Sequence, residues 1–311
     1  MPRLFCFGLG YSALALIDRL QPQGWRIAGT TRTPGTAARL GARGIEVHPF
    51  DRGRPIEDAA AVLAGTTHLL STVPPDAEGD PVLARHAADI AGIGAGIGAG
   101  IEGLRWVGYL STTGVYGDHG GAWVDEDAPR RPSGRRGAAR VAAEDGWLAL
   151  LHEHGVPVHL FRLPGIYGPG RSAIDALRAG TARRIDKPGQ VFSRIHVEDI
   201  ARALEASMAR PAPGRAYNIC DDEPAPGHEV TAHAACLLGI EPPPLVPFDR
   251  ADLSPMAASF YADSKRMRND RMKRELTGAL RYPTYREGLA AQIEAETGAE
   301  TGMETGSAKQ D

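Results

Sequence analysis

Short apolar segments alternate with longer amphipathic ones along the first half of the chain. Compact apolar runs are typical of strands buried on both faces, and a 3.6-residue apolar period, as at Leu14, Ile17 and Leu20, predicts a helix. The predicted strands are Leu4–Phe7, Trp25–Thr31, Ile45–Phe50, His68–Val73, Trp106–Leu110 and Val158–Leu163. Further helices are predicted at Thr36–Ala42, Ile56–Leu63, Pro81–Ala91 and Arg136–His154. This alternation predicts an α/β fold with a doubly wound parallel sheet.

The regular alternation ends after Leu163, where glycine and proline become frequent. Such punctuation predicts a smaller C-terminal substrate lobe built from insertions, with a helix at Val197–Met208 and a strand at Arg215–Ile219 that returns to the sheet. We assign residues 1–170 and 191–220 to the sheet domain and residues 171–190 and 221–296 to the lobe. Residues 297–311 lack an apolar face, so we expect a disordered tail.

The most informative motif follows the first predicted strand. Gly8, Gly10 and Ala13 form Gly-x-Gly-x-x-Ala between a strand and a helix. Gly8 permits the tight turn, Gly10 lets a pyrophosphate approach the backbone, and Ala13 keeps the helix close to the sheet. The helix N-terminus adds free N–H groups and a positive dipole end, so the motif predicts a dinucleotide site.

A second match to the glycine motif, at residues 98–103, has a different setting. It precedes a predicted strand, and it belongs to a run in which every second residue is glycine, a composition that disfavours both helix and strand. We interpret it as a loop without chemistry.

Composition narrows the class of partner. The 311 residues are 42% hydrophobic and 23% charged, with a net charge of −3, which is typical of a globular domain. We expect no nucleic-acid partner, because the chain lacks a one-sided basic surface, and no membrane span, because apolar runs are short. The basic cluster at residues 265–274 contains interspersed acids and is interpreted as a solvated helix face.

Three cysteines, Cys6, Cys220 and Cys236, are too few and too unevenly spaced for a disulfide framework or a metal site. We interpret them as buried thiols in a reducing cytoplasm, and we expect no bound metal.

Five motifs in one order resemble the extended branch of the short-chain dehydrogenase/reductase superfamily, which holds nucleotide-sugar epimerases and dehydratases. They are Gly8/Gly10/Ala13, Asp51 after the third strand, Ser111–Gly117 after the fifth, Arg162–Gly170, and Arg194–Asp199. The resemblance spans residues 3–290 and implies a Rossmann fold, an NAD(P) cofactor and a small-molecule substrate.

The resemblance also implies roles for single residues. Thr112 matches the hydroxyl that hydrogen-bonds a substrate oxygen, Asp51 matches the residue that meets the adenine, and Pro164 and Ile166 lie on the loop that borders the nicotinamide. Substrate positions of the family fall on Tyr116, Arg171, Arg194 and His196. Alternatively, His196 and Asp199 only open and cap the helix that follows.

The end of the second strand bears on which dinucleotide is bound. An NAD-preferring protein places a carboxylate there, whereas this chain has Thr31 and Arg32. A guanidinium offers a planar charged fork that suits a 2′-phosphate, so we predict NADP in preference to NAD.

The catalytic pair of the family is altered. Its Tyr and Lys positions fall on Arg136 and Arg140, and a guanidinium with a pKa above about 12 cannot act as a base at neutral pH. Arg140 retains the capacity to hydrogen-bond the nicotinamide ribose. The proton donor then has to be another group, for which Tyr116, Tyr167, His119 and His196 are candidates.

Two functions from different classes follow. The first is an atypical NAD(P)-binding oxidoreductase or epimerase/dehydratase-like enzyme, acting on a carbonyl or sugar-nucleotide-like small molecule with a displaced proton donor. The second is a non-catalytic NADP(H)-binding sensor, which the arginine substitutions favour. A conventional nucleotide-sugar epimerase ranks third, because it needs the missing Tyr. A homodimer is possible through the helix at Arg136–His154.

Overall fold

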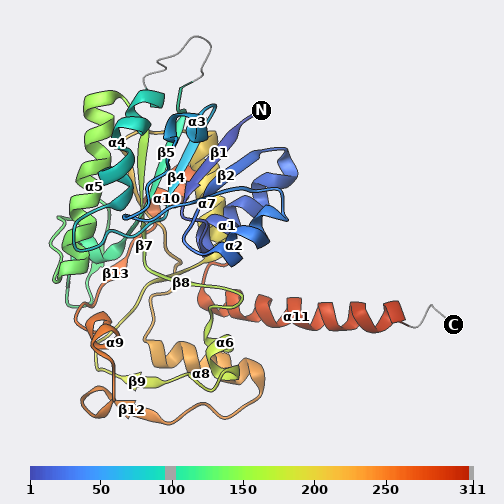
Figure 1. The fold of residues 1–311 in the computed structure, drawn as a ribbon. Coiled ribbons are helices and arrows are strands. Elements are labelled where there is room, and N and C mark those ends of the chain that lie inside the picture. The colour runs from blue at the N-terminus through green and yellow to red at the C-terminus, as the bar shows by residue number, and fades with distance from the viewer. Residues whose placement is uncertain (95–102, 308–311) are drawn as a thin grey trace.

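The structure is a computed structural model and describes residues 1–94 and 103–307. A seven-stranded parallel sheet forms its centre (Figure 1). From edge to edge the strands are β11 (Ala216–Asn218), β7 (Val158–Leu163), β5 (Trp106–Thr112), β4 (His68–Ser71), β1 (Arg3–Phe7), β2 (Arg26–Thr31) and β3 (Glu46–Pro49). The strand order reverses between β1 and β4. A reversal of this kind leaves a crevice at the carboxyl ends of the strands, where α/β proteins bind ligands.

Helices cover both faces of the sheet. One face carries α1 (Tyr11–Leu20), α2 (Pro34–Gly41) and α7 (Val197–Ala209), and the other carries α3 (Ala59–Leu63), α4 (Pro81–Gly94) and α5 (Arg135–His154). Along β1, Leu4 and Cys6 enter the first core, whereas Phe5 and Phe7 enter the second. Because both faces are buried, the central strands are largely apolar, which confirms the predicted doubly wound sheet.

A smaller lobe lies beyond the carboxyl ends of the strands (Figure 1). Its core joins α6, α8 and the first turns of α11. Three short parallel pairs, β8–β10, β9–β12 and β6–β13, link it to the sheet domain or brace it. The elements are β6 (Trp123–Val124), β8 (Gly165–Tyr167), α6 (Ala173–Arg178), β9 (Arg184–Asp186), β10 (Arg194–His196), α8 (Gly227–Leu238), β12 (Leu245–Pro247), α9 (Pro255–Phe260), β13 (Arg266–Met267), α10 (Asp270–Met272) and α11 (Tyr285–Ser307).

Most element predictions are confirmed. The six predicted strands form the sheet, and the strand predicted at Arg215–Ile219 returns to it as β11 beside β7. The helix predicted at Ile56–Leu63 begins only at Ala59. Its start is fixed by the side chain of Asp58, which accepts a hydrogen bond from the backbone N–H of Ala61.

The last helix, α11, is described as far as Ser307, and the expectation of a disordered tail from residue 297 stays a prediction. The helix is anchored by Tyr285 and Leu289, which are 1% exposed in the lobe core. This packed start stabilises the first turns of the helix, because adding a residue to an existing helix is far easier than nucleating one.

Two side-chain expectations also need correction. The basic cluster at residues 265–274 is not one helix face, because it contributes to β13, α10 and a π-helical turn. Cys6 and Cys220 are buried, but Cys236 is exposed near the end of α8. The second glycine motif lies outside the described residues, apart from Gly103. In the part of the chain that the structure describes, no helix is long and apolar enough to cross a bilayer.

Candidate functional site

The turn after β1 is built around Gly8. Its φ of +89° suits glycine, and a Cβ at this position would lie 2.6 Å from the Thr72 hydroxyl oxygen. The Gly8 N–H donates to Thr30 Oγ1 at 2.9 Å, and the Thr72 hydroxyl donates to the Gly8 carbonyl at 2.8 Å. Two neighbouring strands therefore hold the turn in place. Thr30 and Thr72 were not predicted as site residues, because nothing in their local pattern shows that they meet this turn.

Gly10 has a different reason to be glycine. It precedes α1 with a φ of −95°, and a Cβ here would meet nothing within 4 Å. No side chain caps α1, and its first turn contains no acidic residue. Behind it, Ala13 is fully buried against the sheet. The first N–H groups of α1 thus face open space, an arrangement that fits a phosphate group.

A cavity of about 550 Å³ opens beside this turn. It brings together Gly8, Gly10, Thr31, Arg32 and Asp51, five of the residues predicted to hold the dinucleotide. Asp51 is oriented through one carboxylate oxygen, Oδ1, which accepts the N–H groups of two following residues at 2.9 and 3.0 Å.

Arg52, which directly follows Asp51, also lines this cavity and was not predicted. Its guanidinium donates two hydrogen bonds of 2.7 Å each to the Asp76 carboxylate. Two arginines, Arg32 and Arg52, therefore border the expected adenosine position.

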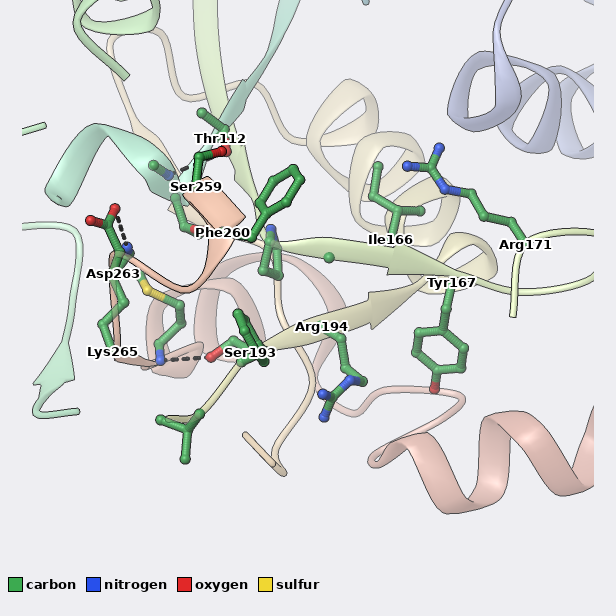
Figure 2. A pocket seen from close by; sticks show the side chains of 17 residues that line it. Thr112, Ile166, Tyr167, Arg171, Ser193, Arg194, Ser259, Phe260, Asp263 and Lys265 are labelled. Atoms are coloured by element: carbon green, nitrogen blue, oxygen red, sulfur yellow. Dashed lines mark hydrogen bonds and ion pairs between the residues drawn. The ribbon is translucent and has the colours of Figure 1, made fainter. Parts of the chain in front are cut away.

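A second cavity, of about 540 Å³, lies at the carboxyl ends of β5 and β7 (Figure 2). The register pairs Thr112 of β5 with Leu163 of β7, so Thr112 lies beside the loop that begins at Pro164. Predicted residues that line this cavity are Thr112, Pro164, Ile166, Arg171 and Arg194. The residues predicted to contact the substrate and those predicted to border the nicotinamide therefore line one cavity.

Thr112 is the N-cap residue of a short 3-10 turn, Thr113–Tyr116. Its Oγ1 accepts a hydrogen bond from the Gly114 N–H at 3.2 Å, which leaves the hydroxyl hydrogen for a ligand. The start of α5 packs against this turn, since a Cβ on Gly137 would lie 2.7 Å from the Gly114 carbonyl oxygen.

The two arginines of α5 have separate surroundings. Arg140 donates from Nη1 to the carbonyl of Leu110 at 2.6 Å and to the Tyr109 hydroxyl at 3.1 Å. Arg136 is exposed, with its Cζ 5.6 Å from the centre of the Phe260 ring. Neither belongs to the lining of the second cavity, although Phe260 does.

Tyr116 lies in the core instead of the cavity. It is fully buried, its hydroxyl donates to Asn218 Oδ1 at 2.8 Å, and it accepts from Arg162 Nη1 at 2.7 Å. Burial raises the pKa of Tyr116 to about 12. These contacts argue against the predicted roles of Tyr116 in substrate binding and proton transfer.

His196 caps the helix that follows it, which is the alternative to a substrate contact. Its Nδ1 accepts from the Glu198 N–H at 3.2 Å and so caps α7. Burial lowers its pKa to about 4, and its ring packs against Tyr167 and Tyr282. His196 is absent from the lining of the second cavity, as is the other histidine candidate, His119.

Arg194 and Tyr167 line the cavity but use their polar groups elsewhere. Arg194 donates to the Ala225 carbonyl at 3.0 Å, and Tyr167 donates to the Thr284 carbonyl at 3.2 Å. Burial lowers the pKa of Arg194 and raises the pKa of Tyr167. Both residues shape the wall more than they offer free groups.

Lys265 lines the second cavity and was not predicted as a site residue. It reaches the same cavity as Thr112 from just before β13, and its Nζ donates to the Gly117 carbonyl at 2.7 Å and lies 3.4 Å from Asp263. Burial lowers the pKa of Lys265, while Asp263 opposes the shift. An ammonium has three donors, so one remains for a ligand. The sequence carries no local signal for this placement, because Lys265 meets the Thr112 turn only through the fold.

Among the described residues, no three His, Cys, Asp or Glu side chains are grouped so as to hold a metal ion.

Comparisons with known proteins agree with this architecture. A model of the NAD-dependent epimerase/dehydratase family matches residues 97–220. Protein YeeZ of Escherichia coli K12 is 29% identical over 254 residues, which cover 78% of this chain and 86% of YeeZ.

Solved structures extend the similarity over nearly the whole chain. A functionally unknown conserved protein from Silicibacter pomeroyi is 52% identical, with a TM-score of 0.86, and covers 95% of this chain and 99% of its own. MoeE5, solved with UDP-glucose and NAD, is 21% identical over 96% of this chain and 99% of its own, with a TM-score of 0.72. The likeness to MoeE5 shows a shared fold.

Proposed function

We propose that this chain, which matches the NAD-dependent epimerase/dehydratase family model over residues 97–220, is a nicotinamide-dinucleotide enzyme acting on a carbonyl or sugar-nucleotide-like small molecule. The observation that carries the proposal is the open space at Gly10, where the uncapped start of α1 faces outward. In this proposal Arg32 and Asp51 hold the adenosine half, and Pro164 and Ile166 border the nicotinamide.

The dinucleotide supplies or accepts the hydride when bound. Thr112 donates its free hydroxyl hydrogen to the substrate oxygen and so orients the reacting carbon. We assign proton transfer to Lys265, because it lines the cavity of Thr112 and its pKa is lowered by burial. In the reductive direction the substrate oxygen takes a proton from the Lys265 ammonium, and water returns it to the amine.

The decisive experiment for catalysis uses reduced cofactor and a panel of carbonyl compounds, with Thr112→Val as the matched variant. An enzyme oxidises the cofactor with at least one compound, and Thr112→Val slows this turnover while leaving cofactor affinity unchanged. In Lys265→Met the rate falls, and it no longer changes with pH over the range in which Lys265 titrates in the wild type.

We further propose that NADP is preferred to NAD. Support comes from Arg32, which lines the adenosine-side cavity, and from the absence of a carboxylate at the end of β2. Arg32→Ser weakens NADP binding about tenfold or more, the usual range for losing a charge-assisted hydrogen bond, and leaves NAD binding unchanged. Equal weakening of both would refute the preference.

A non-catalytic NADP(H) sensor is the second candidate. It is favoured by Arg136 and Arg140, which the resemblance assigns to the Tyr and Lys positions of the family's catalytic pair. The sensor binds the dinucleotide tightly and turns over no member of the panel. Turnover gained by Arg136→Tyr combined with Arg140→Lys in an inert wild type supports this reading.

A cytoplasmic location and a homodimer through α5 also belong to this proposal. Light scattering on the purified chain tests the dimer directly through its mass.

A further inference from the structure

A four-residue strap, residues 168–171, crosses the start of α1 on its way from β8 to α6. The Tyr11 hydroxyl, from the first turn of α1, donates to the Pro169 carbonyl at 3.1 Å. Contact is so close at Gly168, which has a φ of +146°, that a Cβ there would lie 2.6 Å from the Tyr11 hydroxyl oxygen. The strap therefore touches the helix end that faces the open space at Gly10.

The last residue of the strap, Arg171, has a fixed backbone. Its N–H donates to the Gly168 carbonyl at 2.9 Å, which closes the turn of the strap. Immediately afterwards Ser172 starts α6 with a capping box, in which Ser172 and Asp175 exchange hydrogen bonds of 2.7 to 3.2 Å. The position from which the Arg171 side chain projects is thus set on both sides.

Arg171 is exposed and differs from the other cations that line the cavity in what its guanidinium contacts. Its Cζ lies 5.9 Å from the centre of the Tyr11 ring, and within the described chain no carboxylate or carbonyl is bonded to it. By contrast, Lys265 is bonded to Gly117 and lies beside Asp263, and Arg194 is bonded to backbone carbonyls. Figure 2 shows Arg171 at the end of the cavity opposite Lys265.

The first turn of α1 carries no acid, and the Arg171 guanidinium lies beside Tyr11. One carboxylate, Asp175, also acts on Tyr11, but it is hydrogen-bonded to Ser172 and Gln292 and not to Arg171. One cavity lies on the Gly10 side of α1 and the other contains Arg171 and Ile166, so a ligand that occupies both has to pass between them. In a dinucleotide the group at the centre is the pyrophosphate.

We propose that Arg171 binds the cofactor pyrophosphate from the lobe side and clamps it against the N–H groups of α1. This inference rests on the proposed function and changes the predicted role of Arg171 from a substrate contact to a cofactor contact. A guanidinium suits this task because it presents a planar fork of donors to phosphate oxygens.

The test measures binding of ADP-ribose and of AMP to the wild type and to Arg171→Gln by calorimetry. ADP-ribose carries the pyrophosphate without the nicotinamide, whereas AMP lacks the pyrophosphate. Arg250→Gln is the matched control, because it removes one exposed charge from the same lobe. We expect Arg171→Gln to weaken ADP-ribose about tenfold or more and to reduce the salt dependence of its binding, with AMP unchanged.

The outcomes separate the two proposals. Wild-type protein that binds ADP-ribose, with equal affinity in Arg171→Gln, overturns the clamp and leaves the proposed function standing. Wild-type protein that binds neither ADP-ribose nor NADP overturns both. Equal weakening in Arg250→Gln assigns the effect to general charge and also overturns the clamp.

Discussion

Two glycines in the first turn of the chain are needed for different reasons. Gly8 is required by the protein itself, because its φ is positive and a Cβ would collide with Thr72. Gly10 has an ordinary φ and free space around it. A glycine that the fold does not need, at the start of an uncapped helix, is what a bound phosphate requires.

This difference predicts a separation of stability from binding. Gly10→Asp adds a favourable N-cap and a negative charge at the positive end of α1, so the free energy of unfolding stays the same or rises by about 0.3–1 kcal/mol. The same carboxylate repels a pyrophosphate, so dinucleotide affinity is lost. Urea unfolding and calorimetry measure the two effects. Gly10→Asn, of similar size without charge, is the control, and undiminished binding in Gly10→Asp would place the cofactor elsewhere.

At the residue scale the sequence predicted positions better than orientations. Gly8, Gly10, Arg32 and Asp51 do meet in one cavity, because parallel strands end at the same edge of a sheet. Motif position did not show that Tyr116 turns into the core. Lys265 reaches the site by tertiary contact alone, so no periodicity or spacing in the sequence identifies it.

At the scale of elements, a buried ion pair ties α5 to β7 behind Thr112. Glu144 is fully buried and receives two hydrogen bonds from Arg162, at 3.0 and 2.8 Å. Its Oε1 also accepts the hydroxyl of Ser111, the residue before Thr112, at 2.6 Å. The network therefore fixes the strand end that presents Thr112 to the cavity.

Glu144→Gln leaves the Arg162 charge buried without its anion, and breaking such a pair costs about 3–5 kcal/mol of folding free energy. Asp18 provides the control, because its side chain is 60% exposed in its ion pair with Arg43 and such pairs contribute about 0–1 kcal/mol. Urea denaturation compares Glu144→Gln with Asp18→Asn. Equal losses would show that the buried network adds no more than a surface pair.

Periodicity predicted the elements of the sheet domain because each helix and strand there is long enough to show its repeat. The lobe strands, such as β9 and β12, have three residues each, which is too short for a repeat to be seen. Their pairing depends on long-range contacts, so the sequence predicted only a lobe rich in turns.

At the scale of the whole molecule, the junction of sheet and lobe contains a buried carboxyl group. Asp221 follows β11 and is 1% exposed. Burial raises its pKa to about 8, Arg194 opposes the shift, and Asp222 and Glu223 add to it. The folded protein thus keeps a proton that the unfolded chain releases near pH 4.

A raised pKa in the folded state means that stability is full below the unfolded pKa and is lost as pH rises toward about 8. The loss approaches about 1.4 kcal/mol per pH unit within this window. Asp221→Asn removes this contribution, so the variant gains on the wild type between pH 5 and pH 8, as unfolding at several pH values would show. A constant difference across this range would contradict the raised pKa.

The central claim is that one dinucleotide spans both cavities from Gly10 to Ile166. Its most direct test is thermal unfolding of the wild type and Gly10→Asp with excess NAD, NADH, NADP and NADPH. A ligand at 100 times its dissociation constant adds about 2.7 kcal/mol to the stability of the folded state. We predict an increase in Tm for the wild type, largest with NADP or NADPH, and none for Gly10→Asp. A wild-type Tm that none of the four dinucleotides raises would contradict the account.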